Sequence, residues 1–116
     1  MHEATLWILS ALADAPRHGY GVIQEVQRLS DGKVRLLAGT LYGALDRLAA
    51  DGLIAVDRDE VVGGRNRRYY RLTGDGEAAL EAESERLRRA AEAATAQLAV
   101  RRRLGLGPAS AHRIAW

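Results

Sequence analysis

The sequence predicts a mainly α fold with a small two-stranded β wing and a long C-terminal helix. Three observations predict it. Apolar residues recur at helical spacing in three segments before residue 52. Two short β-rich segments, 53–57 and 68–72, flank a stretch that contains paired glycines. Residues 74–104 contain no proline and keep a helical apolar period, which corresponds to a helix of about 45 Å.

Composition limits the class of protein. With 116 residues, 47% of them hydrophobic and 28% charged, the chain is expected to fold rather than remain disordered. No segment approaches the roughly 20 apolar residues of a membrane span, so no membrane partner is expected. The absence of cysteine excludes disulfides and fits a cytoplasmic protein. Because the net charge is only +2, binding to a polyanion would depend on local clusters of positive charge.

The first expected helix spans residues 2–13 and is apolar on two sides. The arc expected to face the core consists of Leu6, Leu9, Leu12 and Ala13. Trp7 and Ala11 lie almost opposite that arc, and Ile8 lies between the two. A helix with two apolar sides is usually buried on both sides. We therefore expect Trp7, Ile8 and Ala11 to meet a second surface outside this core.

Two further helices are expected at residues 18–29 and from about residue 39 to residue 51. Either Gly39 or Thr40 is available as the N-cap of the later helix. The outer arc of that helix is polar or small and consists of Thr40, Tyr42, Gly43, Asp46 and Arg47. This arc is therefore free to meet a partner.

A hairpin is expected next, with strands at 53–57 and 68–72 joined by residues 58–67. Tyr70 and Leu72 alternate onto one face of the second strand and are assigned to the core. Four arginines with no acidic residue among them follow the paired glycines: Arg65, Arg67, Arg68 and Arg71. The hairpin is therefore expected to project a basic tip.

The last helix is expected to have Thr73 as its N-cap and to tolerate Gly74 and Gly76 in its first turn. Small and apolar residues alternate along it at the spacing of four and three that is typical of a coiled coil. This seam consists of Leu80, Ser84, Leu87, Ala91, Ala94 and Leu98. A domain of about 70 residues cannot cover a helix of about 45 Å, so the simplest partner is a second copy of the chain. The expected divisions are 1–73, a dimerisation helix at 74–104, and a short tail at 105–116 with no assigned role.

Three helices followed by a basic hairpin are the elements of a winged helix-turn-helix. In that fold one helix enters the major groove of DNA, and the hairpin reaches flanking phosphates or the minor groove. The candidate DNA-binding residues are Thr40, Tyr42, Gly43, Arg47, Arg65, Arg67, Arg68 and Tyr20. A homodimer would present two such helices to an inverted repeat in double-stranded DNA.

Several of these residues have a structural alternative. Tyr42 could pack against the hairpin or the linker before its helix, and Tyr20 could seal its helix against the core. Arg47 could pair with Asp46 or Asp51. The arginines of the hairpin could form a solvated charge run. Each alternative would leave the residue without a role in binding.

Four segments resemble the PadR family of transcriptional regulators in its short form. They are HGYG at 18–21, GTLYGALDRL at 39–48, DGLI at 51–54 and GGRNRRYYRLTGDG at 63–76. The resemblance covers about the first two thirds of the chain and implies a winged-helix repressor that dimerises through its C-terminal helix. It also implies a DNA contact by Tyr42 and, as in many members, a response to small aromatic or amphipathic molecules. The chain departs from the family pattern at Gly43, where proline is usual, and at Gly21, where glutamate is frequent.

Other functions are weighed against this one. The small residues in the middle of the seam allow close helix contact or a cavity between subunits, in which case Trp7, Ile8 and Ala11 would wall an effector pocket. The three histidines lack the spacing of a metal site and no catalytic set is present, so no enzyme activity, metal or cofactor is expected. The alternative function is a winged-helix module for protein–protein contact without specific DNA binding.

Overall fold

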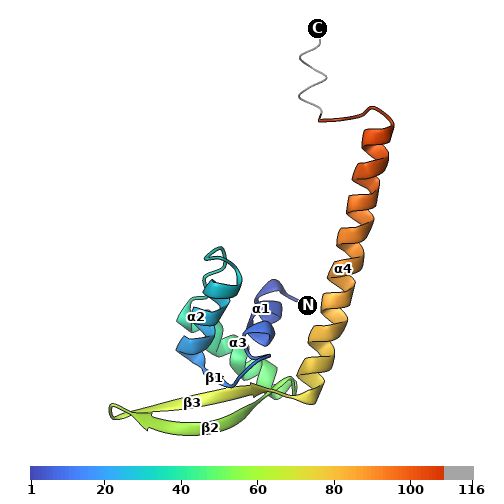
Figure 1. Ribbon diagram of the computed structural model, residues 1–116. Coiled ribbons are helices and arrows are strands. Elements are labelled where there is room, and N and C mark those ends of the chain that lie inside the picture. The colour runs from blue at the N-terminus through green and yellow to red at the C-terminus, as the bar shows by residue number, and fades with distance from the viewer. Residues whose placement is uncertain (109–116) are drawn as a thin grey trace. The chain divides into compact units, whose positions relative to one another are not determined.

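The computed structural model describes residues 1–108 (Figure 1). Its elements are α1 (Glu3–Ala11), β1 (Arg17–His18), α2 (Gly19–Leu29), α3 (Ala38–Ala50), β2 (Ile54–Val62), β3 (Arg65–Leu72) and α4 (Gly74–Arg103). The predicted mainly α fold, with a hairpin and a long last helix, is confirmed. Most of the predicted tail at 105–116 lies outside the described residues.

The chain divides into two compact units, Met1–Glu83 and a second that begins at Ser84. Residues 74–83 of α4 therefore belong to the first unit, ten residues beyond the division that the sequence suggested at 73/74. The physical reason lies in the first turns of α4, where Gly76 is buried and Leu80 packs against the core of the first unit. The start of α4 is thus part of the packed domain.

The core of the first unit is formed by α1, α2, α3 and the base of the hairpin. Its buried apolar side chains are Ile8, Leu9, Ala11, Leu12, Val22, Val26, Leu41, Ala44, Leu45, Leu48, Ile54 and Tyr70. Most are aliphatic and recur at helical spacing, so their burial supplies the main stabilisation of this domain. Figure 1 shows the three helices on the same side of the hairpin.

The predicted inner arc of α1 is partly wrong. Leu6 is only half-buried and Ala13 is exposed, because the helix ends at Ala11. Ile8 and Ala11 are instead fully buried beside Leu9 in the core of their own chain. Side chains enclosed in this way offer no surface to a ligand. The prediction that Ile8 and Ala11 wall an effector pocket is therefore wrong.

The sheet has three antiparallel strands in the order β1-β3-β2. The sequence analysis missed β1, a two-residue strand that pairs Arg17 with Tyr70 and His18 with Tyr69. It also made the hairpin strands too short, since β2 and β3 continue to a turn of only two residues, Gly63-Gly64. Both glycines have positive φ values, 57° and 79°, as a type I′ turn between twisted strands requires. The expected ten-residue loop is thus a regular ribbon.

Arg17 connects three parts of the first unit. Its Nε donates to the carbonyl of Ala11 at 2.8 Å, and its Nη2 lies 3.1 Å from both Asp14 and the buried Glu25. Glu25 also accepts two hydrogen bonds from Arg28, and these bonds lower the pKa of the Glu25 carboxyl. The network ties the end of α1 to β1 and α2.

The first turn of α4 packs tightly against the backbone of residues 52–53. The hydroxyl of Thr73 accepts from the N–H of Gly76 at 3.0 Å and donates to the carbonyl of Gly52 at 2.6 Å, which confirms Thr73 as the cap. A Cβ on Gly76 would lie 2.0 Å from the carbonyl oxygen of Leu53. Gly76 is therefore required rather than merely tolerated, whereas Gly74 has open space around its Cα.

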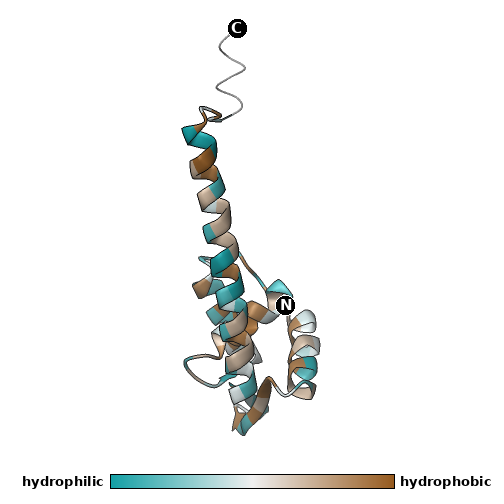
Figure 2. Ribbon diagram, turned by 90° about the vertical axis from the view of Figure 1, so that its right-hand side faces the viewer, coloured by the Kyte–Doolittle hydropathy of each residue, from teal (hydrophilic) through white to brown (hydrophobic). Residues whose placement is uncertain are grey.

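The part of α4 that begins at Ser84 is almost wholly exposed in one chain. Apolar bands recur among hydrophilic ones along the helix in Figure 2. The exposed fractions of Leu87 and Leu98 on this helix are 39% and 50%. Acidic residues occupy the first turn and Arg101, Arg102 and Arg103 the last, which suits the helix dipole. None of the helices within residues 1–108 is both long and apolar enough to cross a membrane.

Candidate nucleic-acid interface

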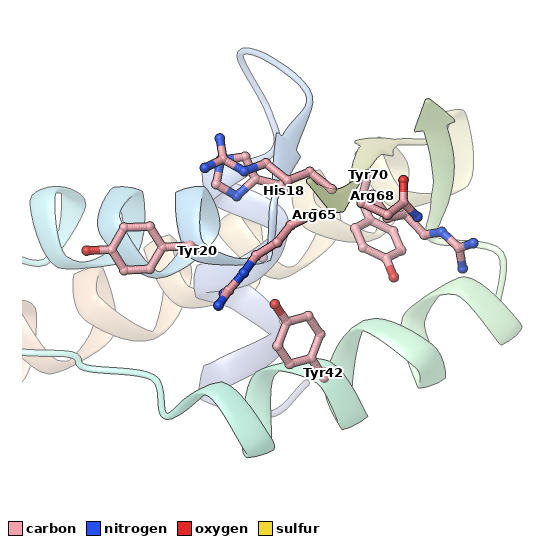
Figure 3. A pocket seen from close by; sticks show the side chains of 9 residues that line it. His18, Tyr20, Tyr42, Arg65, Arg68 and Tyr70 are labelled. Atoms are coloured by element: carbon pink, nitrogen blue, oxygen red, sulfur yellow. The ribbon is translucent and has the colours of Figure 1, made fainter. Parts of the chain in front are cut away.

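A cavity of about 520 Å³ lies where the starts of α2 and α3 meet β3. Its lining residues are His18, Gly19, Tyr20, Tyr42, Arg65, Asn66, Arg67, Arg68 and Tyr70. Five of the eight predicted DNA-binding residues thus meet here, although they come from three separate elements. In the close view of Figure 3, the guanidinium of Arg65 extends between Tyr20 and Tyr42. We call this concave surface the tyrosine–arginine cavity.

The two exposed tyrosines differ in how they are held. Tyr20 is 61% exposed, so the alternative that it seals α2 against the core is wrong. Tyr42 is 53% exposed, and one side of its ring packs over Gly19 at the start of α2. The ring keeps an open face toward solvent, and it lines the cavity together with Arg65 and Tyr70 of β3.

The outer side of α3 carries the other three predicted residues. The structure corrects one detail, because the N-cap of α3 is Leu37 and no side chain caps the helix. Thr40 is exposed in the first turn, where backbone N–H groups lack helical partners and favour anions. Arg47 is exposed and lies beside Gly43, with its Nη1 3.8 Å from the position of an added Cβ. Within residues 1–108 it pairs with neither Asp46 nor Asp51, so that alternative is wrong.

The arginines of the wing fall into two groups. Arg68 forms an ion pair with Asp59 on the opposite strand at 3.2 Å. Arg65 and Arg67 form no ion pair with any residue in the described part of the chain, and both are exposed. The register places Arg67 opposite Glu60 and Arg65 opposite Val62. Asp59 and Glu60 could not be predicted as neighbours of these arginines, because they lie on the opposite strand and come close only through the register of the hairpin.

Tyr69, which alternates onto the same face of β3 as Arg65 and Arg67, makes aromatic contacts near the base of the ribbon. The ring of Tyr69 meets His18 edge-on at 5.2 Å between centroids and lies 4.0 Å from the guanidinium carbon of Arg58. His18 also caps α2, since its Nδ1 accepts from the N–H of Gly21 at 3.3 Å. Burial and the nearby charge of Arg67 lower the pKa of His18, against a smaller opposite effect of Glu60. A neutral imidazole is what this cap requires.

The residues of the predicted dimer seam do not share one environment, and neither do those of the predicted effector pocket. Leu80 packs against the core of its own chain, whereas the seam residues from Ser84 onward are exposed. Trp7 is half-buried against the same core, and its indole N–H donates to Glu3 at 3.3 Å.

The described residues contain no cluster of His, Asp or Glu that could hold a metal ion. Exposed tyrosines, unpaired arginines and a free helix start are suited to binding a phosphate backbone rather than to acid–base chemistry.

The fold is similar to solved structures of bacterial regulators. A PadR family transcription regulator from Clostridium difficile R20291 superposes with a TM-score of 0.70 at 26% identity, covering 84% of this chain and 99% of that one. Bacillus subtilis PadR in complex with operator DNA has a TM-score of 0.63 at 22% identity, covering 70% of this chain and 45% of that one. These similarities support the assignment of the fold as a winged helix.

A curated relative gives a closer match in sequence. Transcriptional regulator Rv3488 of Mycobacterium tuberculosis is 48% identical over 75 residues, which cover 65% of this chain and 66% of that protein. The matched part thus spans just under two thirds of the relative. The model of the family described as "Transcriptional regulator PadR-like family" matches residues 8–82, and such proteins are regulators rather than enzymes. This chain therefore belongs to the PadR-like family of transcriptional regulators.

Proposed function

We propose that this protein represses transcription by binding double-stranded DNA as a homodimer at inverted-repeat operators. The observation that carries the proposal is the tyrosine–arginine cavity, which brings the start of α3 and the unpaired arginines of β3 to one surface. Tyr42 and Arg47 on α3 would face the major groove, and Arg65 and Arg67 would neutralise flanking phosphates. Bacillus subtilis PadR, which has the same fold, has been observed with operator DNA.

The homodimer is proposed because of the exposed seam of α4. Leu87 and Leu98 leave 39% and 50% of their surface in water in a single chain, at positions that a coiled coil would bury. The small residues of the same seam, Ser84, Ala91 and Ala94, allow a second helix to approach closely. Two copies joined in this way would present two recognition helices at the spacing of an inverted repeat.

The test of DNA binding is a titration at several salt concentrations, with duplexes from upstream of the protein's own gene and a scrambled duplex. We expect a preference for the natural duplex at physiological salt. Arg65→Ala and Arg67→Ala should each lower the slope of log affinity against log salt by about 0.9, because each removes one phosphate contact. Arg103→Ala at the end of α4 removes the same charge elsewhere and should leave the slope unchanged.

An unchanged slope in both wing variants would contradict the proposed phosphate contacts. If the wild-type protein showed neither duplex preference nor salt dependence, the DNA-binding function itself would be wrong. The alternative, a winged helix that binds another protein, predicts that second result. Ion pairs such as Arg68–Asp59 on the wing are compatible with either function, so the unpaired arginines are the informative positions.

We also propose that a small aromatic or amphipathic effector releases the repressor, with Trp7 beside the bound molecule. Trp7 supports this role because it is only half-buried, in contrast to the enclosed Ile8 and Ala11. In a Trp116→Phe background, planar aromatic compounds should change the fluorescence of Trp7 and weaken DNA binding over the same concentration range. Release from DNA with no change in fluorescence would place the effector elsewhere.

A further inference from the structure

We infer that Gly19 is a positioning residue for DNA recognition, because the space that its missing side chain leaves fixes the ring of Tyr42. The inference rests on the proposed DNA-binding function and extends it to a residue that makes no predicted DNA contact. Gly19 is buried at the start of α2, and Tyr42 lies in the first turns of α3. Residues far apart in the sequence therefore meet at the edge of the tyrosine–arginine cavity.

The contact is tight. A Cβ on Gly19 would lie 2.9 Å from the Oη of Tyr42 and 3.0 Å from its Cε1 and Cζ atoms. These atoms form the outer end of the ring, the part that is expected to reach DNA. Because real Cβ atoms essentially never lie closer than 3.0 Å to a neighbour, a side chain at residue 19 would force the outer end of the ring to shift by a few tenths of an ångström.

The backbone gives no other reason for a glycine here. The glycines of positive φ within the described residues are Gly32, Gly52, Gly63, Gly64 and Gly105, and Gly19 is not among them. It has ordinary helical geometry at the first position of α2. Glycine is a poorer helix former than alanine. Gly19 therefore lowers helix propensity, and the space for Tyr42 is the evident compensation.

Seating the ring on Gly19 has a consequence for binding. One face of Tyr42 is covered by α2, while 53% of the side chain remains exposed. The side chain thus has fewer conformations to lose when it meets a partner, and ordering a free side chain costs about 0.5–1.5 kcal/mol on association. Figure 3 shows the hydroxyl of Tyr42 directed toward the cavity that Arg65 enters. Gly19 thereby holds the hydroxyl in the binding surface.

Gly21 is a matched control in the same turn of α2. A Cβ on Gly21 would lie 3.5 Å from the Cβ of Arg17 and 3.7 Å from the imidazole of His18, which are ordinary contacts. Gly19→Ala and Gly21→Ala therefore make the same chemical change two residues apart in the first turn. Only the first variant displaces Tyr42, and the displaced group is the far end of a side chain, so the fold should persist.

The experiment compares operator and scrambled duplexes for the wild type, Gly19→Ala, Gly21→Ala, Tyr42→Ala and the double variant Gly19→Ala/Tyr42→Ala. Gly19→Ala should weaken operator binding by about 2- to 10-fold, through the cost of ordering one side chain. Its affinity for the scrambled duplex and its salt slope should stay unchanged. Gly21→Ala should bind as the wild type does. Adding Gly19→Ala to Tyr42→Ala should have no further effect, since the ring it displaces is absent.

A second measurement separates this inference from the proposed function. In thermal unfolding, Gly19→Ala should be less favourable when Tyr42 is present than in the Tyr42→Ala background, because the contact exists without DNA. Additive effects on unfolding and on binding would overturn the inference, as would equal losses in Gly19→Ala and Gly21→Ala. If the wild type bound no duplex while the unfolding coupling were present, the contact would stand and the role in recognition would be wrong.

Discussion

Gly76→Ala is expected to destabilise the first unit by about 3 kcal/mol, at the upper end of what overpacked sites cost. The added Cβ would lie 2.0 Å from the backbone oxygen of Leu53 and 2.8 Å from a methyl carbon of Leu72. A backbone oxygen held in the fold cannot move aside as a side chain can. The first turn of α4 would therefore separate from residues 52–53, and the bond from the hydroxyl of Thr73 to the carbonyl of Gly52 would be lost.

Thermal unfolding followed by circular dichroism measures this effect, and we expect the melting temperature to fall by about 12–24 °C. Gly74→Ala is the matched control, because it lies two residues away in the same helix and has nothing within 4 Å of the added Cβ. It should unfold at or slightly above the wild-type temperature. Equal stability of the two variants would show that α4 does not dock on Leu53 as the structure has it.

The second large effect is expected from charge introduced into the seam of α4. The double variant Leu87→Glu/Leu98→Glu should be monomeric at micromolar concentration, because pairing would bury four carboxylates in apolar surroundings. Operator affinity should fall by about 100-fold or more, since the two half-sites would no longer be bound by one linked molecule. Light scattering during size-exclusion chromatography and a titration of operator DNA measure the two consequences.

The matched control is Ala82→Glu/Ala96→Glu, which adds the same residue type to α4 on the side opposite the seam. That variant should remain dimeric and should lose only the small affinity expected from added negative charge. Should the seam variant stay dimeric, or should the control dissociate equally, the predicted seam would not be the dimer interface. A wild-type protein that is monomeric at the same concentration would contradict the dimer as a whole.

Much of the fold could be predicted because local patterns agree with the tertiary structure. The helical period of Leu41, Ala44, Leu45 and Leu48 predicts the buried side of α3, and all four residues are buried. The residue type of Thr73 predicts a helix cap, and its hydroxyl does accept from the N–H of Gly76. In these places the chemistry of one short segment determines the structure of that segment.

Other features depend on contacts between distant segments and could not be predicted from either segment alone. The pairing of Arg68 with Asp59 requires the register of the hairpin, which follows from a two-residue turn rather than the expected ten-residue loop. The need for Gly76 becomes visible only when Leu53 is placed beside it. The helical wheel of α1 shows two apolar arcs and cannot tell which one is enclosed, so the prediction places Ile8 and Ala11 on the wrong side.

The short strand β1 divides the hairpin into a three-stranded base and a two-stranded outer part. β1 pairs with β3 only at Tyr69 and Tyr70, so from the Asp59–Arg68 pair outward the ribbon has two strands and no further neighbour in the sheet. Isolated two-stranded ribbons are only marginally stable in water. Arg65 and Arg67 therefore lie on the part of the domain with the least local stability. Every measured affinity for a ligand that binds there includes the free energy of ordering these two strands.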